Sequence, residues 1–283
     1  MDQYCLMGNP VEHSKSPWIQ NRFAELTGQP VHYDKRLVPI DGFDTAVHDF
    51  RGQGGQGCNV TVPFKLQAAA IATQASPRVT LALACNTLRF DGDQIHADNT
   101  DGVGLMNDIT LNAGVPLTGR DVLLIGAGGA GAGVLGPLLE QNPRRVVLAN
   151  RTATRATEVA ARHQALATQH GVDLVACGLQ DAPVLAASFD VVINASSSSL
   201  QGAGVPVPAS VLRPGALAYD LMYGPAAQGF MDWATAHGAV PRDGLGMLVE
   251  QAASAFEFWR GVRPPTGPVL AEMRALIDKA AKA

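Results

Sequence analysis

A short apolar run that leads directly into a glycine-rich turn constrains this chain more than any other feature. Residues 122–125 read Val-Leu-Leu-Ile, and the turn that follows reads Gly-Ala-Gly-Gly-Ala-Gly. A strand, this spacing of glycines and the helical stretch Gly131–Gln141 match the fingerprint of a dinucleotide-binding βαβ unit. Gly126 permits the tight turn, Gly128 lets the backbone approach a pyrophosphate, and Gly131 allows the helix to pack closely on the strand.

We therefore expect the whole turn to bind phosphate. The first N–H groups of the following helix, and the partial positive charge there, favour an anion. An ordinary glycine-rich turn is the competing interpretation, since the chain has 30 glycines among 283 residues. The strand before the turn and the helix after it favour the nucleotide site. The predicted phosphate-binding residues are Gly126, Ala127, Gly128, Gly129, Ala130 and Gly131.

The next strand, Val146–Ala149, indicates which dinucleotide is bound. Enzymes that select NAD usually place an acidic residue at its end, which binds the ribose 2′-hydroxyl. Here the strand ends in Asn150, Arg151 and Thr152, and Arg155 follows. Two guanidinium groups suit the nearly dianionic 2′-phosphate of NADP. The alternative interpretation of Arg151 is a solvated surface arginine without a role in binding. The sequence therefore predicts NADP as the cofactor.

Three further positions are assigned to the cofactor site. Ser196 opens a run of four serines that follows the strand Val191–Asn194. The run is either a loop on the nicotinamide side or a polar turn, and both interpretations stay open. Met222 and Gly244 are assigned to the cofactor with it.

Strands and helices alternate along the chain, which predicts an α/β fold with mostly parallel sheets. Several strand-like runs are continuously apolar, as expected for strands covered on both faces. We expect an N-terminal α/β substrate domain (residues 1–103) and a Rossmann-type, doubly wound NADP domain (104–243). The C-terminal helices (244–283) should return to the first domain, with a hinged cleft between the two. The expected strands are Gln3–Met7, Val31–Val38, Cys58–Val62, Val122–Ile125, Val146–Ala149, Val191–Asn194 and Ala216–Asp220, and the expected helices include Pro17–Thr27, Val103–Asn112 and Ala153–His170.

Composition excludes several classes of protein. The net charge is −4 without a basic cluster, which argues against a nucleic-acid partner, and no apolar run is long enough to span a membrane. The four cysteines are far apart and lack metal or redox spacing, so we expect small buried hydrophobes of a reducing compartment. The N-terminus does not resemble a signal peptide, and we expect a cytoplasmic protein.

Lys65 and Asp101 form a candidate proton-transfer pair. An apolar strand that ends in Pro-Phe-Lys delivers the ammonium group of Lys65 to a strand terminus, where open sheets bind ligands. Asp101 lies just before a second glycine-rich turn and could face the lysine. Next to a hydride carrier, such a pair makes up most of an alcohol dehydrogenase. From these residues alone, a surface ion pair is an equally good interpretation.

Polar residues near both ends of the chain are candidates for binding a polyol or a carboxylate. Ser16, followed by a proline, is by default a helix N-cap, and this role explains Ser14 less readily. His13 is more simply a solvated loop residue than a base. Gln251 lies on the apolar face of a helix, where a ligand or the backbone could satisfy its amide.

Taken together, these motifs resemble those of the shikimate dehydrogenase family. The resemblance covers essentially the whole chain, and the motifs occur in the family's order and spacing. They are Gly8–Pro10, His13–Pro17, Asn59–Lys65, Asn86–Thr87, Asn99–Gly104, the glycine turn, Asn150–Thr152 and Gly244–Ala252.

The resemblance implies the reversible, NADP-dependent reduction of 3-dehydroshikimate to shikimate, a step of aromatic amino-acid biosynthesis. It implies that Lys65 and Asp101 flank the reacting oxygen, and that Tyr223 closes the site from the cofactor domain. No macromolecular partner is implied, and we expect a monomer or a homodimer. The residues assigned to the hydroxyls and the ring carboxylate of the substrate are Ser14, Ser16, Asn59, Thr61, Asn86 and Gln251.

The chain departs from the family's usual residues at several positions. Leu83-Ala84-Cys85 replaces Gly-Ala-Val, residues 73–77 lack the usual acid, and Ser196 and Gln228-Gly229 replace Thr and Thr-Pro. These changes suggest a divergent subgroup, for which quinate is the rival substrate. A dinucleotide-binding regulatory protein without catalysis, and a methyltransferase that uses S-adenosylmethionine, are alternatives from other classes. Arg151 counts against the methyltransferase.

Overall fold

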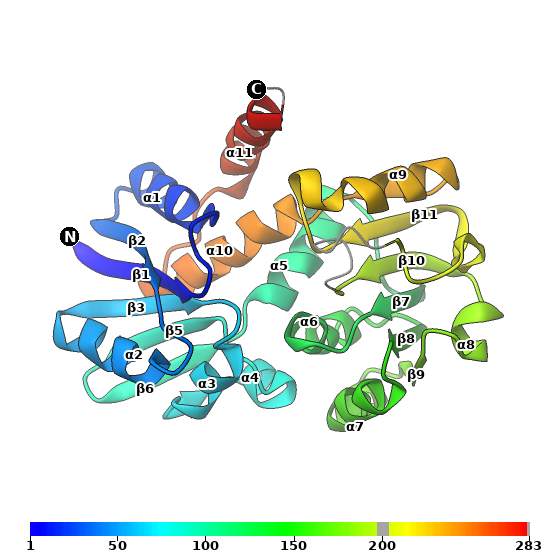
Figure 1. Cartoon of the computed structure of the whole chain (residues 1–283), viewed down its shortest axis with the longest axis horizontal. Coiled ribbons are helices and arrows are strands. Elements are labelled where there is room, and N and C mark those ends of the chain that lie inside the picture. The colour runs from blue at the N-terminus through cyan, green and yellow to red at the C-terminus, as the bar shows by residue number, and fades with distance from the viewer. Residues whose placement is uncertain (197–203, 282–283) are drawn as a thin grey trace.

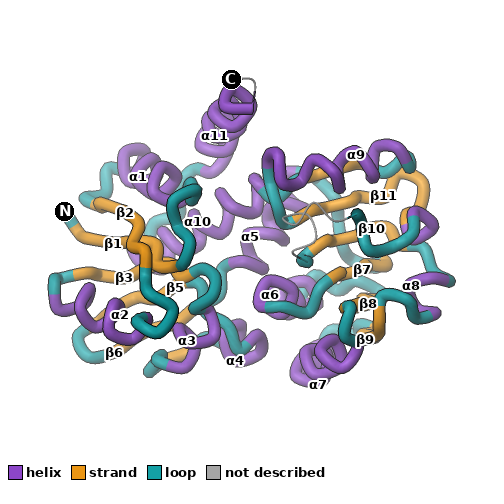
Figure 2. The backbone as a smooth tube through the Cα atoms, in the orientation of Figure 1, coloured by secondary structure: helices purple, strands orange, loops and turns teal. Residues whose placement is uncertain are grey.

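The chain folds into two α/β domains that lie side by side (Figure 1). A computed structural model describes residues 1–196 and 204–281. The strands form two separate groups in the tube view, and helices α5 (Asp101–Asn107) and α10 (Leu245–Arg260) run between them (Figure 2). This architecture confirms the predicted fold class.

The first domain is built on a mixed six-stranded sheet with the order β2-β1-β3-β5-β6-β4. β1 pairs in parallel with β2 and β3, whereas β5 pairs antiparallel with both β3 and β6. The expected strands did not include the β5–β6 hairpin, although both of its strands alternate polar and apolar residues and the turn Gly92-Asp93 has a glycine with φ 53°. The strands are β1 (Asp2–Gly8), β2 (Val31–Leu37), β3 (Gly55–Val60), β4 (Gln74–Ala75), β5 (Thr87–Asp91) and β6 (Gln94–Asp98).

The second domain carries a parallel six-stranded sheet with the order β12-β11-β10-β7-β8-β9. The strand order reverses between β7 and β10, and open sheets of this type bind dinucleotides at the carboxyl ends of such neighbouring strands. The glycine turn follows β7 and therefore lies at this point. The strands are β7 (Asp121–Ile125), β8 (Arg145–Asn150), β9 (Asp173–Gly178), β10 (Phe189–Asn194), β11 (Leu212–Asp220) and β12 (Val240–Arg242).

Helices cover both faces of each sheet. In the first domain, α1, α10 and α11 pack on one face, and α2, α3 and α4 pack on the other. In the second domain, α5, α6 and α7 cover one face, and α8 and α9 cover the other. The described part of the chain holds no helix with the length and apolarity needed to cross a membrane. The remaining helices are α1 (Ser16–Thr27), α2 (Phe43–Gly52), α3 (Lys65–Ala70), α4 (Pro77–Ala82), α6 (Gly129–Leu139), α7 (Ala153–Gln169), α8 (Ala182–Leu185), α9 (Gln228–Ala236) and α11 (Thr266–Ala281).

The return of α10 and α11 to the first domain agrees with the prediction. Phe256 of α10 packs against Phe23 of α1, with ring centroids 6.0 Å apart. Val269 and Met273 of α11 join the same core, and all four side chains are almost fully buried. Burial of aromatic and aliphatic side chains of this size contributes about 1.5–3 kcal/mol each. The C-terminal helices are therefore an integral part of the first domain.

Glycines allow α5 to pack very closely on its two neighbouring helices. A Cβ atom built on Gly102 would lie 2.7 Å from the carbonyl oxygen of Gly133 in α6. A Cβ atom built on Gly104 would lie 2.6 Å from the backbone nitrogen of Gln251 in α10. Neither position has room for a side chain, so α5 is fixed between α6, the helix that follows the glycine turn, and α10.

A buried carboxylate fixes the C-terminal end of α5 to the second sheet. The helix continues as a π-helical turn, Asp108–Asn112, and Asp108 is fully buried. Arg242 donates two hydrogen bonds to Asp108, at 2.7 and 2.6 Å, and Tyr219 donates a third at 2.8 Å. The domain limit predicted after residue 103 falls inside α5, which contacts both halves, and the division into domains stays a prediction.

Leu83 has a backbone conformation that normally selects glycine. It follows α4 with φ 52° and ψ 31°, and its side chain is about half exposed. A Cβ atom in this left-handed region costs about 1–2 kcal/mol. The family's usual glycine at this position is therefore explained by geometry: the chain keeps the turn and accepts strain just before Asn86.

Replacing Leu83 with glycine should stabilise the fold. We expect Leu83→Gly to raise the free energy of unfolding by about 0.5–1 kcal/mol, because relief of strain exceeds the flexibility that glycine adds to the unfolded chain. Urea denaturation measures this difference. Asn142→Gly is the control, since Asn142 has a similar φ of 53° but tolerates it and donates a hydrogen bond to Glu140. Lower stability of Leu83→Gly would contradict the assignment of strain.

Candidate active site

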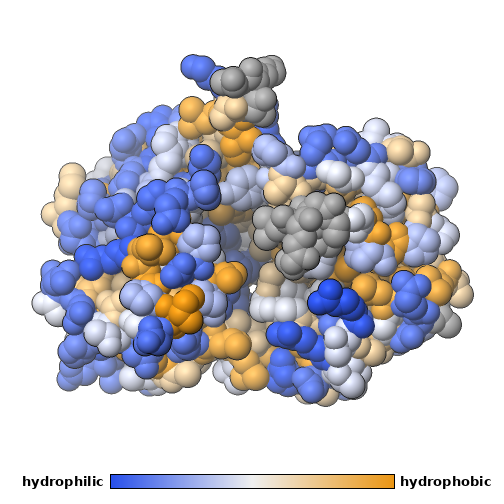
Figure 3. Space-filling view, viewed as in Figure 1, coloured by the Kyte–Doolittle hydropathy of each residue, from blue (hydrophilic) through white to orange (hydrophobic). Residues whose placement is uncertain are grey.

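A cavity of about 440 Å³ lies where the two domains meet, and it contains most of the predicted site. The space-filling view shows the recess that separates the two halves of the molecule (Figure 3). Its walls come from distant parts of the chain: the segments after β1 and β3, Asn86 just before β5, the N-terminus of α5, the segment after β11, and α10. The predicted residues that line it are Ser14, Ser16, Asn59, Thr61, Lys65, Asn86, Asp101, Tyr223, Gly244 and Gln251.

Lys65 and Asp101 are in direct contact in this cavity. The Nζ atom of Lys65 lies 2.5 Å from Oδ2 of Asp101. Their side chains are only 19% and 11% exposed, so the pair is not the surface ion pair that the sequence left open. Lys65 begins α3 and Asp101 begins α5, where the helix N-terminus favours a carboxylate. The two groups therefore form one unit in the cavity wall, within reach of a bound ligand.

Asn86 holds the second oxygen of Asp101. Its Nδ2 atom donates to Oδ1 of Asp101 at 2.8 Å and to the hydroxyl of Thr100 at 3.0 Å. Its Oδ1 atom accepts the N–H of Thr100 at 2.9 Å and the hydroxyl of Thr87 at 2.9 Å. Every polar atom of this buried amide therefore has a partner, which fixes the rotamers of Asn86 and Asp101.

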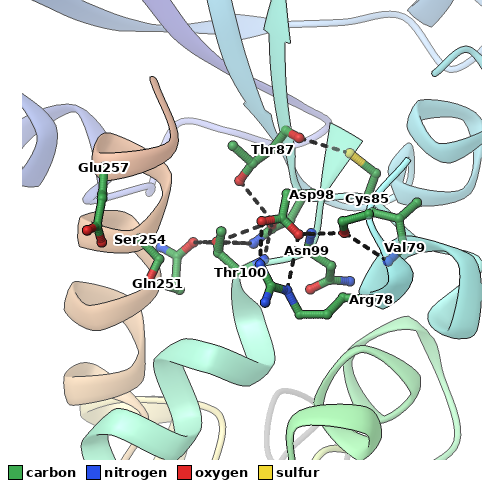
Figure 4. A network of polar contacts seen from close by, with 12 residues as sticks. Arg78, Val79, Cys85, Thr87, Asp98, Asn99, Thr100, Gln251, Ser254 and Glu257 are labelled. Carbon is green, nitrogen blue, oxygen red and sulfur yellow. Dashed lines mark hydrogen bonds and ion pairs between the residues drawn. The ribbon is translucent and has the colours of Figure 1, made fainter. Parts of the chain in front are cut away.

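Gln251 reaches the same network from α10. Its Oε1 atom accepts from Asn86 at 3.4 Å and from Thr100 at 3.5 Å, and its Nε2 atom donates to the carbonyl of Leu248 at 2.8 Å. The facing side chains of Gln251 and Thr100 are visible in Figure 4. The glutamine thus combines the two roles that the sequence left open, a backbone hydrogen bond and a position on the cavity wall.

Thr100 is a site residue to which the sequence analysis gave no role. Its hydroxyl lies between Asn86, just before β5, and Gln251 of α10. The available signal was its place directly before Asp101 in the Asn-Thr-Asp-Gly motif. His13 and Met247 also line the cavity, and His13 is exposed at its edge.

The structure corrects the assignment of Ser16 as an N-cap. Lys15 occupies the N-cap position of α1 without a side-chain hydrogen bond, and Ser16 is the first helical residue. The hydroxyl of Ser14 instead accepts the N–H of Ser16 at 3.2 Å. Ser14 therefore satisfies the first N–H of the helix from a position before the N-cap, and the largely buried Ser16 side chain lines the cavity.

Asn59 supports the site from behind. Its Oδ1 atom accepts the hydroxyl of Tyr33 at 2.8 Å, and its Nδ2 atom donates to the carbonyl of Asn86 at 3.2 Å and to Thr87 at 3.0 Å. The amide is thus already paired within the protein. Thr61, by contrast, begins the segment after β3 and presents its side chain at the cavity.

Cys85 precedes Asn86 and is an inert neighbour of the site. Burial raises the pKa of its thiol to about 12, and the thiol donates to the carbonyl of Thr87 at 3.2 Å. The other three cysteines are also free and buried. This agrees with the expectation of small buried hydrophobes.

The glycine turn has the shape that a pyrophosphate requires. Gly126 has φ 106°, and a Cβ atom on Gly131 would lie 1.9 Å from the carbonyl oxygen of Gly126. No atom of residues 1–196 and 204–281 lies within 4 Å of a Cβ atom built on Gly128 or Gly129, so this part of the chain leaves room for a ligand at the N-terminus of α6. The N–H of Ala127 is used within the turn, since it donates to Oδ1 of Asn150 at 3.1 Å.

Two arginines lie just beyond the end of β8, Arg151 in the turn and Arg155 at the start of α7. Arg151 and Arg155 are exposed, and neither guanidinium forms a hydrogen bond or an ion pair within residues 1–196 and 204–281. Asn150 also donates to the carbonyl of Thr152 at 3.0 Å, which shapes this turn. The donor set fits a 2′-phosphate, as the sequence predicts.

Ser196, Met222 and Gly244 lie near the carboxyl ends of β10 and β11. The hydroxyl of Ser196 donates to Asn194 at 2.7 Å, and the other serines of its run lie outside the described residues. Gly244 donates to the carbonyl of Met222 at 2.8 Å, and a Cβ atom on it would lie 2.2 Å from the carbonyl oxygen of Leu221. These contacts place the segment of Tyr223 against the start of α10.

An ion pair fixes that segment to α11. Arg274 donates to both oxygens of Asp243, at 2.7 and 2.5 Å, and the N–H of Gly224 donates at 3.2 Å. Burial alone would raise the pKa of Asp243, but the hydrogen bonds from Arg274 and the backbone lower it. Burial and the nearby Asp243 carboxylate raise the pKa of the Tyr223 phenol. The phenol therefore stays protonated and can donate a hydrogen bond.

Family models of shikimate dehydrogenases match most of the chain. A model described as the shikimate dehydrogenase substrate binding domain matches residues 6–88. One described as shikimate / quinate 5-dehydrogenase matches residues 110–202, and a shikimate 5′-dehydrogenase C-terminal domain matches residues 244–274.

Curated proteins and solved structures give the same result. Shikimate dehydrogenase (NADP(+)) of Acidovorax sp. (strain JS42) is 66% identical over 276 residues, which cover 98% of this chain and 97% of that protein. The structure of an Ael1 enzyme from Pseudomonas putida is 42% identical, with a TM-score of 0.87 over 96% of this chain and 98% of that one. Shikimate 5-dehydrogenase from Thermus thermophilus, in complex with NADP(H) and shikimate, is 28% identical, with a TM-score of 0.83 over 97% and 99% of the chains.

The Asp243–Arg274 pair predicts a pH-dependent contribution to stability. Because the pKa of Asp243 is lowered by folding, the stabilisation is complete above the ordinary value of about 3.9 and is lost as the pH falls through the lower value in the fold. Arg274→Met should therefore lower the free energy of unfolding by about 1–3 kcal/mol at pH 7, and the difference should narrow below about pH 4. Urea denaturation between pH 3 and 7, with the exposed Lys279→Met as control, measures this; a difference that does not change with pH would contradict it.

Proposed function

Because the chain belongs to the shikimate dehydrogenase family, we propose that it catalyses the reversible, NADP-dependent interconversion of 3-dehydroshikimate and shikimate (EC 1.1.1.25). The observation that carries this proposal is the buried Lys65–Asp101 pair in a cavity that adjoins the cofactor domain. Relatives that share up to 66% of their residues with this chain are named for shikimate and NADP(+), so quinate is not favoured as the substrate.

NADP fits the cofactor site that the described residues form. The open cradle at Gly128 and Gly129 suits the pyrophosphate, and the unpaired Arg151 and Arg155 suit the 2′-phosphate. Ser196, Met222 and Gly244 would line the path toward the substrate. When bound, the cofactor supplies the hydride in reduction and accepts it in oxidation.

In reduction, Lys65 donates a proton from Nζ to the substrate's carbonyl oxygen as that oxygen becomes an alkoxide. The ammonium charge also stabilises the developing negative charge, and Asp101 holds the lysine in position. Asn86 keeps Asp101 in a single orientation. In oxidation the same groups take the hydroxyl proton, which returns to solvent through the pair.

The remaining cavity residues recognise a polyhydroxylated acid. Ser14, Ser16 and Thr61 supply hydroxyl groups on the side of the first domain, and Gln251 supplies an amide from α10. Tyr223 supplies a protonated phenol from the cofactor domain. Many neutral donors and acceptors suit such a ligand, because a buried unpaired polar group costs about 1–3 kcal/mol.

We further propose that the protein acts in the cytoplasm as a monomer or a homodimer. The cavity is lined by residues of one chain, so a second copy is not needed to complete it. Four free, buried cysteines are typical of a reducing compartment. Light scattering coupled to size-exclusion chromatography measures the oligomeric state.

An activity panel tests the proposed function. The purified protein is incubated with shikimate and then with quinate, each with NADP and with NAD, and absorbance of the reduced cofactor is followed. We expect the highest kcat/KM with shikimate and NADP. Higher kcat/KM with quinate would overturn the substrate assignment, and activity with neither acid would favour the non-catalytic regulatory protein.

Removing the ammonium group of Lys65 should abolish most of the turnover. We expect Lys65→Met to lower kcat by about 10²–10⁴-fold, because it removes proton transfer, while KM for shikimate changes little. Steady-state kinetics measure both constants, with the exposed Lys279→Met as control. Turnover close to that of the wild type would end the proposed mechanism.

Removing the Arg151 guanidinium should weaken the preference for NADP. We expect Arg151→Ala to raise KM for NADP about tenfold or more, since a hydrogen bond to a charged group is worth about 1.5–3 kcal/mol. KM for NAD should stay the same, because NAD lacks the 2′-phosphate. Arg120→Ala, about half exposed and remote from the carboxyl ends of the strands, is the matched control. Equal changes for both cofactors would show that Arg151 does not recognise the phosphate.

A further inference from the structure

Asn99 is a buried amide that connects three parts of the catalytic machinery. Its Nδ2 atom donates to the carbonyl of Ala84 at 2.9 Å, two residues before Asn86. Its Oδ1 atom accepts the N–H of Asp101 at 3.2 Å. Asn99 is fully buried, and the two hydrogen bonds hold both ends of its amide in one orientation. It thereby ties the backbone of Asp101 to the segment that carries Asn86.

The third contact of Asn99 is with the cofactor helix. A Cβ atom on Gly133 of α6 would lie only 2.9 Å from Nδ2 of Asn99 and 3.2 Å from its Oδ1. Three residues further along the same helix, a Cβ atom on Gly136 would meet His163 at an ordinary 3.7 Å. The amide therefore lies against α6 only because position 133 has no side chain.

Asn99 has little freedom to move away from α6. Its N–H donates to Oδ1 of Asp98 at 2.8 Å, and Arg78 holds the same carboxylate through Oδ2 at 2.6 Å (Figure 4). Ser76 donates a further hydrogen bond to Asp98 at 2.7 Å. With backbone and amide both held, a displacement of the Asn99 side chain passes on to Asp101 and to the Asn86 segment.

We propose that Asn99, packed on Gly133, is a positioning residue that sets Asp101 and Asn86 relative to the cofactor helix. This inference rests on the proposed function, because it assumes that Lys65 and Asp101 carry the proton. Helix α6 follows the glycine turn, so the same rigid element that receives the cofactor also locates the proton-transfer pair. The contact between Asn99 and Gly133 thus fixes the distance between the cofactor, which carries the hydride, and the Lys65–Asp101 pair, which carries the proton.

Two alanine variants of α6 test the proposal. Gly133→Ala places a methyl group against Asn99, whereas Gly136→Ala places one on the same helix in an ordinary contact. Since a 1 Å misplacement costs about 10²-fold in rate, we expect a shift of a few tenths of an ångström to lower kcat about tenfold in Gly133→Ala. Gly136→Ala should keep the kcat of the wild type.

Three readouts separate positioning from general damage to the fold. In Gly133→Ala we expect KM for shikimate, the Kd for NADPH and the melting temperature to stay near the wild-type values. The primary deuterium isotope effect on kcat with 4-deuterated NADPH should rise, because hydride transfer becomes slower than product release. A parallel loss of melting temperature, cofactor affinity and turnover that removal of the Asn99 side chain does not relieve would mean a merely structural role and would overturn the proposal.

A double mutant tests whether the two residues act through one contact. In Asn99→Ala the methyl group of Gly133→Ala enters vacated space, so the double variant should have the kcat and the melting temperature of Asn99→Ala alone. If Gly133→Ala does not fold, the double variant must fold and match Asn99→Ala. Additive losses overturn the inference, and so does a Gly133→Ala variant as active as Gly136→Ala. A wild-type protein inactive on shikimate would instead refute the proposed function.

Discussion

The carboxylate of Asp101 is the group on which the rest of the site depends, because it is an anion held almost out of water. An ionised carboxylate is costly in such a place unless charge and hydrogen bonds compensate for the lost hydration. Lys65 supplies the charge, Asn86 supplies a hydrogen bond, and the N-terminus of α5 adds its partial positive charge. Asn86 is in turn held by bonds to Thr87, Thr100 and Gln251, so the need to compensate one anion organises this segment and Gln251 around it.

Helix α5 converts this local network into a relation between domains. Its C-terminal end is fixed to the second sheet by the Asp108–Arg242 pair, while its first residue lines the cavity between the two domains. Gly102 and Gly104 bring α6 and α10 within backbone contact of the same helix. Asp101 and the backbone of Gln251 are therefore held by a single rigid element, and closure of the cleft would have to occur around it.

The sequence predicted the features whose signals are local and left out those that depend on the folded path. The glycine turn between β7 and α6, the apolar runs of the second sheet and the arginines after β8 all have short-range patterns. The β5–β6 hairpin was missed although its pattern is equally local: both strands alternate polar and apolar residues around the two-residue turn Gly92-Asp93. The site residues followed from motifs, but not all of their partners did: the packing of Asn99 on Gly133 depends on segments that only folding brings together.

Asn150 links the two phosphate sites through one side chain, which accepts from Ala127 in the glycine turn and donates to Thr152 beside the arginines. Both bonds are internal to the protein and neither involves a guanidinium. In the proposed site, recognition of the 2′-phosphate is therefore separate from the scaffold that shapes the glycine turn. Exchange of Arg151 and Arg155 would leave both bonds of Asn150, and with them the shape of the turn, intact.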